Sequence, residues 1–312
     1  MTQYTLKAPA RLALTVNLPA SKSISNRALI ISALSGNVVL PQNLSDCDDT
    51  NVIVKALHDM PYEIDIMAAG TAMRFMTAYL SVNEGEHVLT GTERMKHRPI
   101  RILVDALRYL GADIEYLGEE GFPPLRIRGK KLEGGQIDIP GNVSSQFISA
   151  LLMIGPVLEK GLELNLTGSI ISRPYIDLTL HTMHDFGAKV DWKDIHTIKA
   201  EPCGYRQRDY LIENDWSSAS YWYEMMAIHN HPGDEIRLTG LADASRQGDS
   251  SVRYLFSMLG VKTTFENTEA GIPTTVTLKR VPKRLPRLDY DFVNQPDLAP
   301  TFVVCCCAMN IP

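Results

Sequence analysis

The sequence predicts an α/β fold of repeated helix–strand units with buried helices, arranged in two domains of which the second is incomplete. Three observations support this prediction. Segments of similar pattern recur at regular spacing, short strand-like runs alternate with helical segments, and one helix of each repeat is apolar almost all round. Alternating helices and short strands are typical of α/β layers, and a helix without a polar face is expected to be buried.

The clearest repeat begins at Gly91, Gly168 and Gly240, positions that are 77 and 72 residues apart. In each copy the glycine follows a Leu-Thr pair that ends a strand-like run. A polar loop then leads into an amphipathic helix, which closes with Gly before a further strand. The same order at three places indicates three copies of one supersecondary unit.

A more apolar helix precedes each of these segments, beginning near Gly70, Ser144 and Ser217. Small or hydroxyl residues at these starting points are good N-caps. Because the helix bodies are continuously apolar, we expect them to be buried, and we expect the amphipathic helices to be partly exposed. Further strand-like runs lie at 125–129 and 134–140.

The first and last copies define the predicted domains. Residues 21–45 match the start of the unit, and residues 295–312 match it again but stop where the helix ends, so we expect a chain cut inside a repeat. Three complete units would form one domain over residues 21–213. Residues 1–20 and 214–312 would form the second, incomplete domain, with apolar helix faces left uncovered.

Composition and charge limit the function classes. The 312 residues carry 31 Lys and Arg against 36 Asp and Glu, a formal net charge of −5. Nucleic-acid binders usually present a basic face, so no nucleic-acid partner is expected, although a local basic pocket for a small anion remains compatible. No run approaches the ~20 apolar residues that span a bilayer, and the N-terminal segment is too polar for a signal peptide. We therefore expect a cytoplasmic protein without membrane contact.

The five cysteines are Cys47, Cys203 and the run Cys305–Cys307. An odd number without framework spacing favours a reducing compartment. The run could indicate metal or redox chemistry, but no His or second Cys pair lies near it. The segment "TFVVCCCAM" is predicted to be an apolar helix in which free Cys acts as a small hydrophobe, so no metal is expected.

The stretch "LPASKSISNRALI" places serines and two cations at the beginning of a buried helix. Free backbone N–H groups and the helix dipole favour anions at this end of a helix. Lys22 offers a point charge, Arg27 a planar fork for carboxylate or phosphate, and Ser23 a hydroxyl donor. The alternative is an ordinary capped helix with two solvated basic residues.

Other helix starts carry further candidates. Gly70 would let the backbone approach a ligand closely, and Arg74 follows it. The basic cluster at 94–99 is either a solvated face or the holder of a second anion. Asp297 could cap the last helix or act as a general base. The donors at the remaining helix starts are Ser144, Ser145, Gln146, Ser172 and Tyr175.

Six motifs occur in order over nearly the whole chain: "LPASKSISNRAL", "AGTAMRF", "GTERMKHRPI", "VSSQFISALLM", "SRPYIDLT" and "DWSSASYW". Together they resemble the 5-enolpyruvylshikimate-3-phosphate synthase family of the shikimate pathway. The resemblance implies the enolpyruvyl transferase fold, with two domains of three βαβαββ units each. It also implies transfer of the enolpyruvyl group of phosphoenolpyruvate to the 5-hydroxyl of shikimate 3-phosphate. We expect a monomer that needs no cofactor.

The resemblance also assigns site residues. Lys22 and Asp297 would be catalytic, Lys22 touching both substrates and Asp297 accepting the proton of the 5-hydroxyl. Phosphoenolpyruvate would contact Lys22, Gly70, Arg98 and Gln146. Shikimate 3-phosphate would contact Lys22, Ser23, Arg27, Ser144, Ser145, Gln146, Ser172, Tyr175 and Asp297.

Two alternatives remain open. The sister enzyme that acts on UDP-N-acetylglucosamine shares the chemistry but has Lys-Asn where this chain has Lys22 and Ser23. A substrate-binding but inactive fragment is the other, because the family's general-acid glutamate motif, a later arginine and a near-terminal lysine have no match and would lie beyond Pro312. Ala68 and Phe75 also depart from the family's common Asn and Pro.

Overall fold

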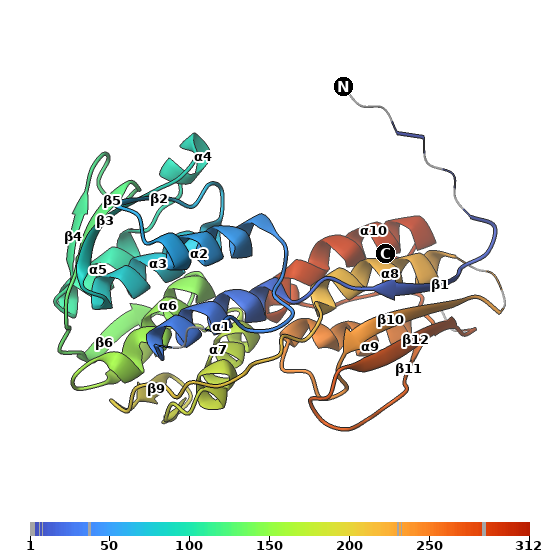
Figure 1. The fold of residues 1–312 in the computed structure, drawn as a ribbon. Coiled ribbons are helices and arrows are strands. Elements are labelled where there is room, and N and C mark those ends of the chain that lie inside the picture. Colours follow the sequence, from blue (N-terminus) through green and yellow to red (C-terminus); the bar gives the residue numbers. More distant parts are fainter. Residues whose placement is uncertain are drawn as a thin grey trace. The chain divides into compact units, whose positions relative to one another are not determined.

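A computed structural model describes residues 4–5, 7, 9–36, 39–229, 231, 233–282 and 285–312. The chain forms two compact units, one of residues 20–212 and the other of residues 1–19 together with 213–312. Figure 1 shows the chain coloured from its N-terminus to its C-terminus. No helix in the described residues is long and apolar enough to cross a membrane.

Within the 20–212 unit, the first sheet has the strand order β2-β3-β5-β4. Strand β2 runs parallel to β3, whereas β5 is antiparallel to both β3 and β4. Its chain order is β2 (Glu63–Asp65), α3 (Gly70–Val82), β3 (Gly85–Thr90), the short α4 (Glu93–Lys96), α5 (Arg101–Tyr109), β4 (Asp113–Tyr116) and β5 (Leu125–Gly129).

The second sheet of this unit repeats that topology with the order β6-β7-β9-β8. Strands β6 and β7 are parallel, and β9 is antiparallel to its two neighbours. Its elements are β6 (Gly135–Pro140), α6 (Ser145–Ile154), β7 (Leu162–Thr167), α7 (Arg173–Asp185), β8 (Val190–Trp192) and β9 (Thr197–Ala200). The strands expected at 125–129 and 134–140 are therefore confirmed as β5 and β6.

The other unit contains a third sheet of the same topology, β1-β10-β12-β11. Its first strand, β1, comes from the beginning of the chain and lies parallel to β10. The elements are β1 (Ala13–Asn17), α8 (Trp216–Ile228), β10 (Glu235–Leu241), α9 (Val252–Met258), β11 (Val261–Phe265) and β12 (Thr274–Arg280), followed by α10 (Ala299–Met309). The βαβαββ unit thus occurs three times, and the helix expected over "TFVVCCCAM" is α10.

The first copy differs from the three copies that form sheets, because its described residues contribute helices and no named strand. Helices α1 (Lys22–Leu34) and α2 (Asp48–Asp59) are joined by a segment that contains no named strand in its described part. The run that follows α1 includes residues 37 and 38, which lie outside the described residues. Gln42 makes one parallel bridge to Leu211, and the adjacent Pro41 has no N–H with which to extend it.

The buried helices predicted from the sequence are most evident in α3, whose residues 70–81 are all buried. It contacts α1, α2, α5 and α6, so apolar neighbours surround it. Helix α8 is a partial exception, since Tyr221, Met225 and Ile228 are 55%, 47% and 41% exposed. Within its unit α8 packs against α9, α10 and the sheet, which leaves one apolar side of the helix exposed.

Candidate active site

Helix α1 begins with a hydroxyl cap and two candidate ligands. The Ser21 side chain accepts a hydrogen bond from the Ile24 N–H at 3.5 Å, and Ser21 is fully buried. Lys22 and Ser23 are the first two helical residues, the lysine exposed and the serine half-buried. No acidic residue lies in this first turn, so the positive end of the helix dipole is not neutralised there by its own helix.

Arg27, one turn further along α1, joins three helices. Its Nε donates to Thr179 Oγ1 of α7 at 2.7 Å, and its Nη2 donates to Ser149 Oγ of α6 and to the Tyr175 carbonyl, both at 3.2 Å. Its Nη1 donates to the Ser23 carbonyl at 2.8 Å. The residue is only 3% exposed, and burial lowers the pKa of Arg27 to about 10, which still leaves it charged at neutral pH.

The starting turns of α3 and α6 meet through Gln146. Its Nε2 donates to Thr71 Oγ1 at 3.1 Å, which places the second residue of each helix side by side. Ser144 is the N-cap of α6, and its hydroxyl accepts the Gln146 N–H at 3.4 Å. Ser144 is exposed, and Ser145 is half-buried. The hydroxyl-rich start of α6 therefore lies beside the Gly-Thr start of α3.

Arg98 lies against the first residue of α3. A Cβ atom added at Gly70 would come within 2.3 Å of Arg98 Nη1 and 2.8 Å of its Cζ. Only glycine allows the guanidinium to approach the backbone this closely. In the part of the chain that the structure describes, no carboxylate forms an ion pair with Arg98. The cation is therefore held over the helix start without an acidic partner.

Ser172 and Tyr175 shape the beginning of α7. Ser172 is the N-cap residue and has a left-handed backbone, with φ of 53°, and its side chain makes no capping bond. The Tyr175 N–H donates to the Ser172 carbonyl at 3.1 Å. The Tyr175 carbonyl accepts bonds from Thr179 Oγ1 and Arg27, so this turn is fixed to α1.

These contacts connect four helix starts within one unit. Arg27 joins the beginnings of α1, α6 and α7; Gln146 joins α6 to α3; and Gly70 joins α3 to Arg98. Figure 1 shows these helices packed together within their unit. Several helix N-termini with adjacent cations make a receptor for anionic groups.

Asp297 belongs to the other unit. It lies in the short 3₁₀ turn Pro296–Leu298 that precedes α10, and Leu298, not Asp297, occupies the N-cap position of that helix. Pro300 falls in the first turn of α10, where its missing N–H breaks no helical hydrogen bond. Among the described residues, no group of three His, Cys, Asp or Glu side chains could hold a metal ion.

Three residues that join the helix starts were not predicted from the sequence: Thr71, Ser149 and Thr179. Each is a hydroxyl residue in the first or second turn of its helix. Ser149 lies four residues after Ser145, and Thr179 four residues after Tyr175, so helical spacing places each on the same face as a candidate ligand. This spacing is the sequence signal by which Ser149 and Thr179 could have been predicted.

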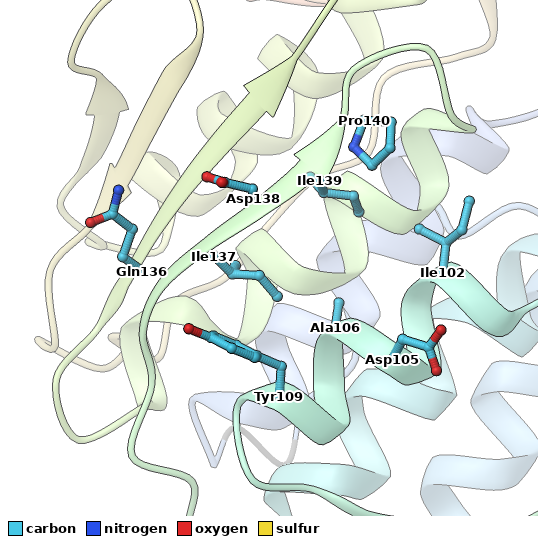
Figure 2. Close-up of a pocket in the computed structure, with 9 residues that line it drawn as sticks. All are labelled: Ile102, Asp105, Ala106, Tyr109, Gln136, Ile137, Asp138, Ile139 and Pro140. Carbon is cyan, nitrogen blue, oxygen red and sulfur yellow. The ribbon is translucent and has the colours of Figure 1, made fainter.

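A separate groove, shown in Figure 2, lies between α5 and the edge strand β6. It has a volume of about 610 Å³. None of the residues predicted to bind substrate lines it, so it is not the candidate active site. Its lining residues are Ile102, Asp105, Ala106, Tyr109, Gln136, Ile137, Asp138, Ile139 and Pro140.

Comparison with solved structures defines the fold. The chain superimposes on an EPSP synthase from Acinetobacter baumannii with a TM-score of 0.76 and 21% identity, covering 95% of this chain and 71% of that one. It superimposes on the enolpyruvyl transferase NikO from Streptomyces tendae with a TM-score of 0.68 and 16% identity, covering 95% and 72%. The fold is therefore that of the enolpyruvyl transferases.

Sequence comparison is more specific. The family model described as EPSP synthase (3-phosphoshikimate 1-carboxyvinyltransferase) matches residues 6–67 and 60–311. A 3-phosphoshikimate 1-carboxyvinyltransferase of Bacteroides fragilis is 57% identical over 310 residues, covering 99% of this chain and 74% of that protein. One from Photobacterium profundum is 37% identical, covering 97% and 75%. The chain belongs to the EPSP synthase family.

Proposed function

We propose that this protein transfers the enolpyruvyl group of phosphoenolpyruvate to the 5-hydroxyl of shikimate 3-phosphate. The products are 5-enolpyruvylshikimate 3-phosphate and inorganic phosphate, on the route to chorismate and the aromatic amino acids. The observation that carries the proposal is the convergence of four helix starts around Arg27, Gln146 and Arg98, in a chain of this family. Both substrates are anions, and both need such a site.

The residues divide between the substrates. Phosphoenolpyruvate binds Arg98 over Gly70, with Lys22 and Gln146 beside it. The geometry around Gly70 supports this assignment, because the guanidinium there lacks an acidic partner in the described chain. Shikimate 3-phosphate binds the hydroxyl-rich starts of α1, α6 and α7 and the Asp297 carboxylate, through Lys22, Ser23, Arg27, Ser144, Ser145, Gln146, Ser172, Tyr175 and Asp297.

The reaction proceeds by addition and then elimination. Asp297 accepts the proton of the 5-hydroxyl, whose oxygen attacks C2 of phosphoenolpyruvate while a general acid donates a proton to C3. The conjugate base of that acid then takes a proton from C3 of the tetrahedral intermediate, and the C2–O bond to phosphate breaks to release inorganic phosphate. Lys22, which contacts both substrates, stabilises the charge that moves onto the departing phosphate. The donors are held in place by helices, so little reorganisation is needed during the reaction.

The unit of residues 20–212 serves as the domain that carries most of the shikimate 3-phosphate site. The unit of residues 1–19 and 213–312 serves as the second domain, to which Asp297 belongs. The division of the chain into these compact units supports this assignment. We further propose that the protein works as a cytoplasmic monomer, without membrane or nucleic-acid partners, in line with its net charge of −5.

The direct test mixes the purified full chain with both substrates. Phosphate release that requires shikimate 3-phosphate, with the enolpyruvyl ether detected by mass spectrometry, is the expected result. Turnover of UDP-N-acetylglucosamine in its place would move the chain to the sister activity. Calorimetric binding of shikimate 3-phosphate without phosphate release would favour the substrate-binding, inactive alternative.

A further inference from the structure

Arg74 is a buried cation of α3 to which the proposed function gives no role. It is 4% exposed, and its guanidinium lies 5.6 Å from the centroid of the Phe147 ring. Its Nη1 donates to the Gly70 carbonyl at 3.1 Å, and its Nη2 donates to the Pro99 carbonyl at 3.0 Å. One side chain therefore ties the first residue of α3 to the residue that follows Arg98.

Both points that Arg74 holds determine where Arg98 lies. Gly70 provides the surface against which the Arg98 guanidinium rests, because an added Cβ there would meet Nη1 at 2.3 Å. Pro99 is the next residue in the chain, so fixing its carbonyl fixes the backbone from which the Arg98 side chain extends. Arg98 is thus restrained at its backbone, next to Pro99, and at its guanidinium, against Gly70. Arg74 donates a hydrogen bond to each of these two residues.

The two guanidinium groups also interact electrostatically. Burial, with the charge of Arg98 adding to it, lowers the pKa of Arg74 to about 10, so both groups are charged at neutral pH. Neither has a carboxylate partner in the described part of the chain. Two neighbouring cations without an acidic partner attract an anionic substrate more strongly than either cation does alone.

We propose that Arg74 is a positioning residue for phosphoenolpyruvate, acting through Arg98. By bonding the Gly70 and Pro99 carbonyls it holds the Arg98 guanidinium over the start of α3, where the anionic groups of phosphoenolpyruvate bind. This inference rests on the proposed function. A merely structural arginine would instead support the packing of α3 and affect both substrates alike.

The first test measures kinetic constants of Arg74→Met and Arg74→Lys in the full chain. We expect Arg74→Met to raise KM for phosphoenolpyruvate roughly tenfold while KM for shikimate 3-phosphate stays within about twofold. Arg74→Lys should recover part of the loss. The matched control is Arg280→Met in the other unit, since Arg280 Nη1 likewise donates to two carbonyls, those of Leu259 and Val281. An equal rise in both KM values would overturn the proposal.

The second test is a double-mutant cycle between Arg74→Met and Arg98→Met. If Arg74 acts through Arg98, its replacement should change KM for phosphoenolpyruvate by less than about twofold once Arg98 is already methionine. Additive effects of the two substitutions would contradict the proposal, because they would mean that Arg74 acts on the substrate by another route.

Failure of the proposed function can be told apart from failure of this inference. If the wild-type chain releases no phosphate, hydrogen exchange decides the positioning role without any substrate. Arg74→Met should then speed amide exchange across residues 93–100 by about tenfold or more and leave residues 22–34 unchanged. Unchanged exchange across 93–100, or equal acceleration of both segments, would show that Arg74 does not hold the Arg98 segment.

Discussion

The contact between Gly70 and Arg98 depends on a missing side chain. Because the guanidinium occupies the space of a Cβ, Gly70→Ala must push the end of the Arg98 side chain away from the helix start. The displaced group is the flexible tip of a side chain, and Gly70 is helical, so stability should change by less than about 1 kcal/mol. We predict a rise of about tenfold or more in KM for phosphoenolpyruvate, with urea denaturation as the control. A large loss of stability with normal KM would contradict this account.

Ser172 offers a second prediction for a single residue. Its left-handed backbone is unfavourable for Ser and easy for Gly, whereas its hydroxyl makes no capping bond. Ser172→Gly should therefore stabilise the protein by roughly 0.5–1 kcal/mol. Calorimetry should show weaker binding of shikimate 3-phosphate by the same variant, because a donor is lost. Unaltered affinity would remove Ser172 from the substrate site.

Sequence motifs located the candidate residues but not all of their surroundings. Lys22, Ser144 and Ser172 were predicted at helix starts because hydroxyl and basic residues before an apolar run are typical of a helix N-terminus. The partners of Arg27 could not be predicted in this way. Ser149 and Thr179 lie 122 and 152 residues from it, and only the packing of three helices brings them together.

At the scale of elements, Arg27 couples the starts of α1, α6 and α7 and does so at a cost. Burial lowers its pKa to about 10, a fall that corresponds to about 3 kcal/mol by which burial disfavours the charged form. Its acceptors, the Ser23 and Tyr175 carbonyls among them, lie inside helices where backbone bonds already use them. The buried charge of Arg27 is therefore better explained by the binding of an anion than by a contribution to the stability of the fold.

This leads to a prediction for Arg27→Met. Without substrate, the variant should be at least as stable as the wild type, because an apolar side chain of similar length replaces a buried charge. With saturating shikimate 3-phosphate the wild type should become the more stable of the two, since only the wild type gains the full binding energy. Urea denaturation with and without the substrate measures both. A loss of more than about 2 kcal/mol without substrate would mean that Arg27 is mainly structural.

Elements with a clear period were predicted well, and those with weak local signals were not. Helices α3 and α6 follow from continuous apolar runs after hydroxyl or glycine starts. In the first copy, the described residues after α1 make one bridge, Gln42 to Leu211, because pairing depends on a partner far along the chain and Pro41 limits the ladder. The burial of α8 was overestimated for a similar reason, because the sequence of a helix does not show which other elements pack against it.

At the scale of the whole molecule, the repeat visible in the sequence becomes three sheets of one topology. The strand β1 was not predicted as a member of the third sheet, because its partner β10 lies more than 200 residues away. Asp234 helps to hold it there. Its carboxylate accepts the Leu12 N–H at 3.0 Å and Arg11 Nε at 2.7 Å, and His229 Nδ1 lies 2.7 Å away.

Asp234→Asn should therefore loosen the attachment of β1, and the effect should depend on pH. Burial opposes ionisation, but the bonds from Leu12 and Arg11 and the charges of Arg11 and His229 outweigh it and hold the pKa of Asp234 below its usual 3.8. A lowered pKa in the folded state means that the stabilisation is present above about pH 3.8 and is lost as the pH falls through the folded pKa. In urea denaturation of the full chain between about pH 5 and pH 3, the wild type should exceed the variant in free energy of unfolding at the upper end, and the difference should shrink toward the acid end. A difference that stays constant over this range would show that the ionised carboxylate does not hold the strand.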